Sequence, residues 1–325
     1  MTKEKILEEY NKEKKFAIAG NNLYEVEDVY FDLLCNHFSR RLERCLTFIK
    51  EYNELADQYK KSNKSLSSPE FREERDALID DLDKREENGE FNLTEEHKKI
   101  LQFLENFYFK NLETNIHTKQ LQIEDEKVIV PKDQIYHVCN LTSLSQFKSY
   151  ADLGIVPTEW FGVFESQWEG RFCAFVKNDC SKRKIGGEDL SETFVKFYID
   201  NTNPLWKMLS SLDYFEYEHL KETSPEKIKN YYPKEIIDLY EQIVEPLSGS
   251  WKKMHSNPIF PTFTWQAIPG GIPPQLIVGI QIKSKNEEFM KNLTNIQNLF
   301  PNAVIFDETH KVLSNQKQKT NQLTL

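Results

Sequence analysis

The chain has 325 residues, a length that suggests roughly two domains, and its 39% of hydrophobic residues is enough to build a packed core. A formal net charge of −10 repels phosphate backbones, so broad electrostatic binding to nucleic acid is not favoured, although a local basic groove is not excluded. The five scattered cysteines form no CxxC pair, so neither a zinc site nor a disulfide framework is suggested. No apolar run approaches the ~20 residues of a membrane span, so we expect a cytoplasmic protein, or one exported by a route that the sequence does not show.

Helices dominate the prediction for the first part of the chain. Apolar residues at helical spacing predict a long helix over 23–59. A second helix is expected from the capping pair Ser68-Pro69 to the stop at Asn88-Gly89, and a third begins at Thr94. We therefore predict a bundle of three helices over residues 1–118. It contains no catalytic constellation, and we expect it to contact a protein partner or a substrate.

Short strands and turns are predicted from residue 119 onward, because proline, glycine and aspartate bound short β-branched or aromatic runs. Residues 119–313 are therefore predicted to form an α+β domain, followed by a polar tail over 314–325. The aromatic and acidic run 214–221 gives no clear prediction. Strands are expected at 127–131, 134–140, 171–177, 194–200, 263–268, 275–283 and 303–306, and helices at 145–153, 205–212, from 224, at 233–244 and at 286–299.

The chain lacks the motifs of the common nucleotide-binding and hydrolytic sites. No GxGxxG follows a strand, and GxxxxGK[ST], HExxH and GxSxG do not occur. The seven histidines are dispersed, without a pair at metal-ligand spacing. His137 and Cys139 would face the same side of a strand, which leaves open a Cys–His nucleophile or another thiol enzyme built on Cys139 or Cys173.

His137 differs from the other histidines because it lies in a short apolar strand that is followed by a helix, by Gly154 and by an aromatic turn. A histidine that faces a cleft can hydrogen-bond a ribose hydroxyl, while Trp160, Phe161 or Tyr198 stack on a nicotinamide or adenine ring. The alternative is a buried histidine with a backbone partner. The residues alone leave both interpretations open.

Two blocks of sequence carry a resemblance to a known family: I-Y-H-V with the following helix and L-G-I, and the later W-Q-A-I-P-G-G-I-P-P-Q-L-I. Their order resembles ADP-ribosyltransferase-fold enzymes, in particular bacterial toxins that modify DNA bases and, more loosely, the histidine–tyrosine–glutamate class. The resemblance covers 134–282 and implies a mixed, mainly antiparallel β domain with helices that uses NAD. It places His137 and its neighbour Val138 at the ribose, Tyr198 at the ring-stacking position, and Gln266 where the family has its glutamate.

The glutamine at position 266 departs from the family pattern. A carboxylate there would bind the 2′-hydroxyl of the nicotinamide ribose and stabilise the oxocarbenium-like charge that develops as nicotinamide leaves, whereas an amide keeps only the hydrogen bond. The acid could instead come from Glu165, or from Glu159 or Glu169, beside the aromatic turn. Arg171 is a candidate for holding the pyrophosphate. Otherwise the enzyme is slow or transfers a single ADP-ribose, or the domain binds the nucleotide without turning it over.

Two functions follow from these observations. The first is NAD-dependent transfer of ADP-ribose to an unknown acceptor, which could be a protein side chain, a nucleic-acid base or water. The second is a non-catalytic interaction protein with a degenerate nucleotide-binding cleft. The helical first part and the missing glutamate favour the second function, and the ordered pair of His137 and Gln266 favours the first.

Overall fold

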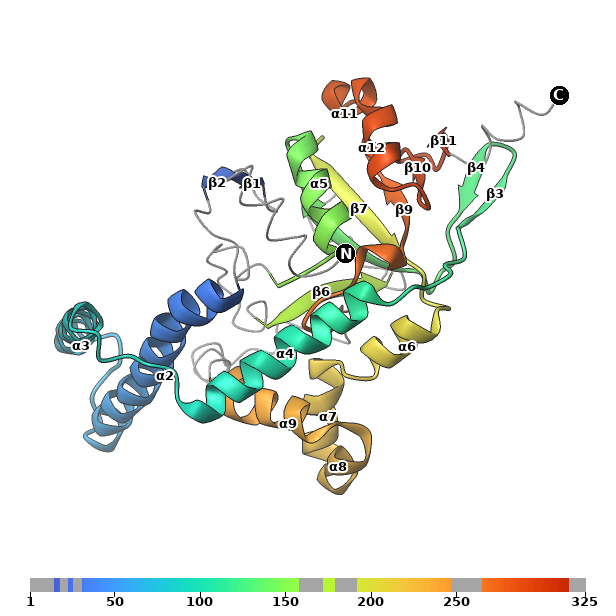
Figure 1. Ribbon diagram of the computed structural model, residues 1–325. Coiled ribbons are helices and arrows are strands. Elements are labelled where there is room, and N and C mark those ends of the chain that lie inside the picture. Colours follow the sequence, from blue (N-terminus) through green and yellow to red (C-terminus); the bar gives the residue numbers. More distant parts are fainter. Residues whose placement is uncertain are drawn as a thin grey trace.

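The computed structural model describes residues 15–17, 23–25, 31–157, 172–178, 192–246 and 265–315 (Figure 1). The longer helices are α2 (Phe31–Lys61), α3 (Pro69–Glu87), α4 (Glu95–Glu113), α5 (Leu144–Leu153), α6 (Pro204–Ser210), α7 (Tyr214–Thr223), α9 (Lys234–Leu239) and α12 (Leu293–Leu299). Shorter helical turns are η3 (Pro225–Lys227), α8 (Ile228–Tyr231), the π-helical η4 (Tyr240–Val244), η5 (Pro274–Leu276) and α11 (Glu287–Lys291).

Seven of the described strands form one mixed sheet in the order β11-β10-β9-β7-β5-β6-β8. Its strands are β5 (Ile135–Asn140), β6 (Cys173–Asn178), β7 (Phe194–Ile199), β8 (Trp265–Pro269), β9 (Ile277–Gln281), β10 (Val304–Phe306) and β11 (Val312–Ser314). Within this sheet β9 and β10 are parallel and the other neighbours are antiparallel. Two separate hairpins are β1 (Lys15–Ala17) with β2 (Leu23–Glu25), and β3 (Gln122–Glu124) with β4 (Lys127–Ile129). The predicted α+β class is confirmed.

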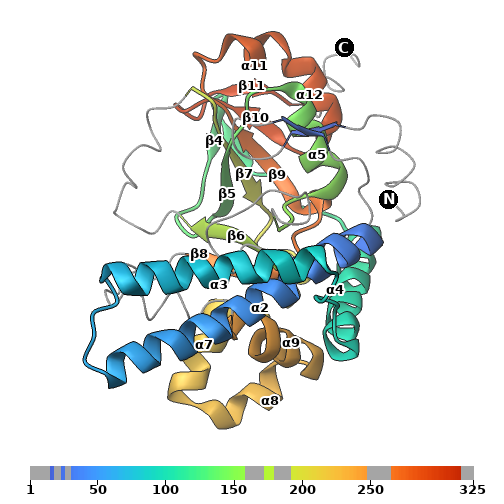
Figure 2. The same cartoon turned by 90° about the vertical axis from the view of Figure 1, so that its left-hand side faces the viewer.

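The sheet is covered by different elements on its two faces. One face, here called the α5 face, packs against α5, α11 and α12 through Phe147, Phe289 and Ile296. At one end of the opposite face, the β3–β4 hairpin contributes Val128 to a small cluster. At the other end, helices α2, α4, α7 and α9 form a layer that packs against β6 and β8 (Figure 2). That layer brings residues from the two halves of the sequence into one core.

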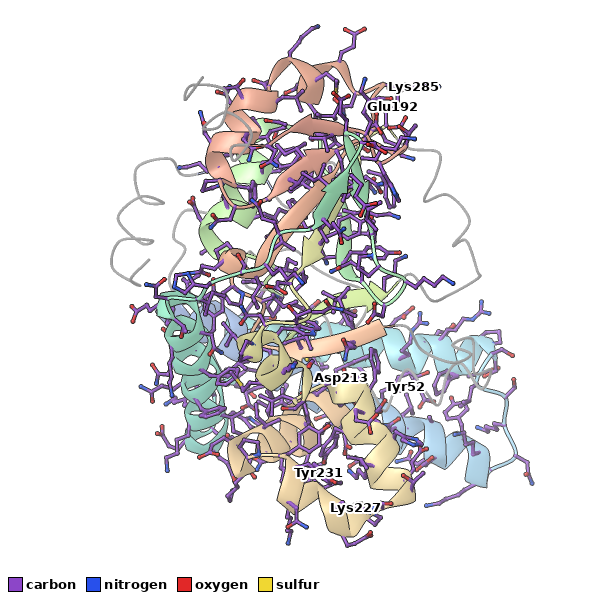
Figure 3. All side chains as sticks on the ribbon, turned by 90° about the vertical axis from the view of Figure 1, so that its right-hand side faces the viewer. Tyr52, Glu192, Asp213, Lys227, Tyr231 and Lys285 are labelled. Carbon is purple, nitrogen blue, oxygen red and sulfur yellow. The ribbon has the colours of Figure 1, made fainter. Side chains whose placement is uncertain are left out.

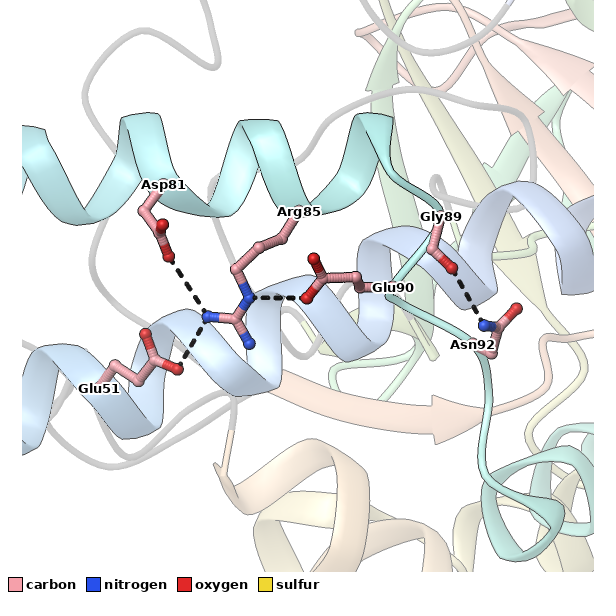
Figure 4. A network of polar contacts seen from close by, with 6 residues as sticks. All are labelled: Glu51, Asp81, Arg85, Gly89, Glu90 and Asn92. Carbon is pink, nitrogen blue, oxygen red and sulfur yellow. Dashed lines mark hydrogen bonds and ion pairs between the residues drawn. The ribbon is translucent and has the colours of Figure 1, made fainter.

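The helices α2 and α3 form a hairpin whose facing surfaces carry many charges (Figure 4). Arg85 of α3 lies 3.1 Å from Glu51 of α2, 3.5 Å from Asp81 and 3.3 Å from Glu90. The helix α3 begins as predicted, with the Ser68 hydroxyl accepting from the Phe71 amide. The ion pairs are largely exposed, so each contributes little to stability, and they mainly fix how the two helices align.

Several expectations about local structure need correction. The first long helix begins at Phe31, not at residue 23, because 23–25 pairs with 15–17 as a hairpin; a short aromatic run fits either structure until its partner is known. The expected helix over 286–299 is broken at Asn292, whose side chain bonds the carbonyl of Glu288. The strands β3 and β11 and the helix α7 were not predicted.

The predicted boundary at residue 118 lies inside a continuous core. One buried cluster joins Leu42 of α2 and Leu104 of α4 to Tyr217 of α7 and Ala267 of β8. The helix α4 packs on α9 as well as on α2, so the N-terminal helices share their core with later parts of the chain. The division into domains at 118 and 313 stays a prediction.

The end of α5 and the turn after β8 are in backbone contact, although more than a hundred residues separate them in the sequence. The amide of Ile155 donates to the carbonyl of Ile272 at 2.9 Å, and the amide of Ile272 donates back at 2.7 Å. Gly154 has a φ of +75°, and a Cβ added there would lie 2.0 Å from the Ile272 oxygen. Gly271, with φ of +98°, approaches the Ile155 oxygen in the same way. Only glycine fits this crossing.

Replacement of Gly154 by alanine is expected to lower the free energy of unfolding by at least about 3 kcal/mol, because it combines backbone strain with a steric clash. Gly89 is the matched control: its φ is also +75°, but an added Cβ would meet nothing within 4 Å. The Gly89→Ala variant should therefore lose only about 1 kcal/mol. Urea denaturation of both variants measures the difference, and equal losses would show that the contact with Ile272 is not tight.

Candidate functional site

His137 lies on β5 where the ladder between β5 and β6 ends. The paired residues are Ile135 with Asn178 and Tyr136 with Lys177. At the next position the imidazole Nδ1 lies 2.8 Å from the carbonyl oxygen of Phe175, so the side chain takes the place of a ladder hydrogen bond. His137 therefore has the backbone partner expected for a structural histidine, and the two strands are held together by its ring.

The second ring nitrogen of His137 faces α5. Nε2 lies 3.3 Å from the hydroxyl of Tyr150, and the two rings lie with their centroids 5.7 Å apart. A carbonyl can only accept, so Nδ1 carries the proton and donates to Phe175, and Nε2 accepts from Tyr150. Burial lowers the pKa of His137 to about 4, although the bond to the Phe175 carbonyl opposes the shift. The imidazole is therefore neutral at physiological pH.

Cys139 shares the α5 face with His137, as predicted, because the two residues lie opposite Val195 and Phe197 of β7. Burial raises the pKa of its thiol to about 12, although a hydrogen bond with Tyr150 opposes the shift. A thiolate–imidazolium pair needs a low thiol pKa and a protonated histidine. Neither condition holds, because burial favours the neutral thiol and the neutral imidazole, and this argues against a Cys–His nucleophile.

Gln266 lies on β8, two strands away from His137, and points to the same face of the sheet. It is paired with Val176 of β6, and Val176 is the residue that the β5–β6 register brings opposite His137. Val176 and Ile268, whose side chains lie on the same face as Gln266, are buried in the cluster beneath α5. The Gln266 side chain is half-buried. The structure thus brings His137 and Gln266 to the same level of one face, about two strand spacings of roughly 4.8 Å apart.

Tyr198 and Val138 lie on the opposite face of the sheet from His137. Tyr198 is paired with Tyr136, whereas His137 is paired with Phe197, and successive side chains of a strand alternate between faces. The Tyr198 ring is buried between Tyr136 and Phe306, with centroid distances of 5.6 and 5.3 Å. The side chains of Tyr198 and Val138 therefore cannot line one cleft with His137. The prediction places Tyr198 on the same face as His137, whereas the register between β5 and β7 places it on the opposite face.

The other candidate residues lie outside the described part of the chain. These are Glu165, Trp160, Phe161, Arg171, Glu159 and Glu169. Their proposed roles as acid, ring-stacking wall and pyrophosphate ligand stay predictions. Tyr150 was not predicted as a site residue. Its position about one helical turn after Phe147, on the apolar side of α5, is the signal that could have identified it.

Comparison of the chain with family models, with curated proteins and with solved structures finds no match. Within the described ranges, no group of three or more histidine, cysteine, aspartate or glutamate side chains is arranged to hold a metal ion. None of the described helices combines the length and the apolarity needed to cross a bilayer. The geometry of His137, Tyr150 and Gln266 is therefore the basis for a functional assignment.

The lowered pKa of His137 predicts a loss of stability in acid. The folded state favours the neutral ring, with a pKa of about 4, while an unfolded histidine has a pKa near 6.5. Its contribution to stability is thus complete above pH 6.5 and is lost as the pH falls toward 4. Between pH 7 and 4.5 the wild type should lose roughly 2 kcal/mol more than His137→Gln.

Urea denaturation of both proteins across this pH range measures that difference. His219→Gln serves as the control, because His219 is exposed on α7 and its variant should keep the pH dependence of the wild type. Parallel curves for the wild type and His137→Gln would show that the ring titrates normally.

Proposed function

We propose that this protein is an NAD-binding protein of the ADP-ribosyltransferase type, with its site on the α5 face of the sheet around His137 and Gln266. One observation carries the proposal: the two sequence blocks of the resemblance meet in space. Their glycine turns cross at Ile155 and Ile272, and their polar residues share one sheet face. Strand order also supports it, because β6 alone separates the histidine strand from the glutamine strand.

His137 would bind a ribose hydroxyl through Nε2. Its Nδ1 is engaged by the short bond to Phe175, which fixes the ring and its tautomer. The contact of Nε2 with Tyr150 is longer, at 3.3 Å, so a ligand hydroxyl that donates at a shorter distance can replace it. The neutral ring presents a lone pair there, and the displaced Tyr150 hydroxyl stays close enough to bond the same ligand.

The reaction would break the bond between the nicotinamide nitrogen and C1′ of its ribose. Nicotinamide leaves with the bonding electron pair, C1′ becomes oxocarbenium-like, and a lone pair of the acceptor forms the new bond to C1′ while the acceptor loses a proton. Gln266 would hold the ribose 2′-hydroxyl by a hydrogen bond. Its neutral amide gives weaker stabilisation of the positive charge than a carboxylate would.

A second candidate function is binding of the nucleotide without turnover. The observation that favours it is Gln266 itself, since this position of β8 carries an amide where the resemblance implies a carboxylate. Both candidates require NAD to bind, and they differ in whether nicotinamide is released. A binding assay and a turnover assay are therefore separate tests.

Isothermal titration calorimetry is expected to detect NAD binding to the full chain. The His137→Ala variant should bind at least about tenfold more weakly, since it loses a hydrogen bond to the ribose worth roughly 1.4 kcal/mol. His219→Ala, on the exposed side of α7, should bind like the wild type. Circular dichroism checks that each variant is folded. Absence of binding to the intact chain would overturn the proposal.

The Gln266→Glu variant is expected to release nicotinamide from NAD faster than the wild type. Restoring a charge at a developing cation is worth on the order of a hundredfold in rate. The matched control is Gln102→Glu, the same change at an exposed position of α4. Release of radiolabelled nicotinamide measures the rates. If Gln266→Glu stays as slow as Gln102→Glu, position 266 does not face the reacting ribose.

A further inference from the structure

The strand that carries Gln266 lies at the edge of the described sheet. The amide of Gly270 donates to the carbonyl of Phe172, so in the antiparallel alternation the amides of Ile268 and Gln266 also point toward β6. The amides of the intervening residues point away from the sheet. Pro269 has no amide hydrogen, and the amide of Ala267 is buried and needs a partner.

Asp213 supplies that partner from the helical layer. Its Oδ1 accepts the Ala267 amide at 2.7 Å, across 54 residues of sequence. The same oxygen lies 3.3 Å from the amide of Phe215, where Asp213 caps the N-terminus of α7. The Ala267 side chain is fully buried among the helices, so the strand is held on this side by packing and by one carboxylate.

Two buried tyrosines fix the backbone that presents this carboxylate. The hydroxyl of Tyr232 donates to the carbonyl of Asp213 at 3.1 Å, and that of Tyr240 donates to the carbonyl of Leu212. Figure 3 shows Asp213 where the helical layer meets the sheet, at the start of α7 and beside β8. The backbone that carries the carboxylate is therefore held in place, as the backbone of a neighbouring strand would be.

We propose that Asp213 is the positioning residue that takes the place of a neighbouring strand for β8, and thereby sets where Gln266 stands relative to His137. The role in holding the strand rests on the geometry alone, while the role in the site rests on the proposed function. Gln266 and Ala267 are consecutive, so a shift of the Ala267 backbone also moves the side-chain amide of Gln266. The helical layer then acts on the site through one hydrogen bond.

The surroundings of Asp213 make this contact sensitive to pH. Burial raises the pKa of its carboxyl to about 7, opposed by the amides of Ala267 and Phe215, and the negative charge of Glu216 raises it further. The other titratable groups beside it are the hydroxyls of Tyr232 and Tyr240, which are neutral at this pH. Burial raises the pKa of Tyr240, and Cys173 of β6 adds to that rise.

Two substitutions separate the contact with β8 from the cap of α7. Asp213→Asn keeps an acceptor oxygen of the same reach, whereas Asp213→Ser keeps a good cap but is too short to reach Ala267. Hydrogen–deuterium exchange of the full chain should show at least tenfold lower protection of the Ala267 amide in Asp213→Ser than in Asp213→Asn. Protection at Phe197 and Ile280, in the centre of the sheet, should be equal in the two variants.

The pH profile of exchange provides a second readout. Local opening exposes Asp213 to water, where a carboxyl has a pKa near 4. Because the closed state has the higher pKa, closure is favoured by protonation and weakens as the pH rises to about 7. Wild-type protection of the Ala267 amide should fall by up to about tenfold per pH unit between pH 5 and 7 and then level off, and Asp213→Asn should show no such fall.

Each other outcome contradicts a defined part of the proposal. Equal protection of Ala267 in the Ser and Asn variants, or an equal loss throughout the sheet, overturns the role in holding β8. Parallel pH profiles for the wild type and Asp213→Asn overturn the carboxylate as the titrating group. Calorimetry with NAD should show about tenfold weaker binding for Asp213→Ser than for Asp213→Asn, and equal affinities overturn the coupling to the site. A wild type that binds no NAD overturns the proposed function, while the exchange experiment still decides the role of Asp213.

Discussion

The crossing of two glycine turns sets where the end of α5 lies relative to the turn after β8. Gly154 and Gly271 let the backbones of Ile155 and Ile272 bond to each other without an intervening side chain. Because α5 ends at this crossing and β8 leads into it, the contact fixes the helix that carries Tyr150 relative to the strand that carries Gln266. A side chain at either glycine would push the two elements apart, and so would change the position of Tyr150 relative to Gln266.

The helical layer supports the same crossing from the opposite side. Tyr108 of α4 donates its hydroxyl to the carbonyl of Leu153 at 2.7 Å, one residue before Gly154. Asp213, the N-cap residue of α7, accepts the amide of Ala267, two residues before the end of β8. Both contacts are buried, so each would cost free energy if its partner were removed. Tyr108, on the N-terminal helix α4, therefore helps to hold the framework of the proposed site.

Much of the local structure could be predicted from the sequence, because its signals are local. The capping residues Ser68 and Thr94 and the terminal Gly154 begin and end helices where expected. The face of Tyr198 could not be predicted in the same way, since it depends on the register between β5 and β7, which only the folded sheet sets. Asp213 caps the helix α7, but its bond to Ala267 spans 54 residues, and no local sequence pattern indicates that the two residues meet.

β8 is an edge strand of the described sheet, and this position bears on contacts with other molecules. An exposed edge strand offers free amides and carbonyls to which a strand of another molecule can add. Here the amide of Ala267 is taken by Asp213, and Pro269 has none to offer. A second chain that approached these two positions would find no backbone donor. The bond to Asp213 thus also removes one backbone donor to which a strand of another molecule could add at this part of the described sheet.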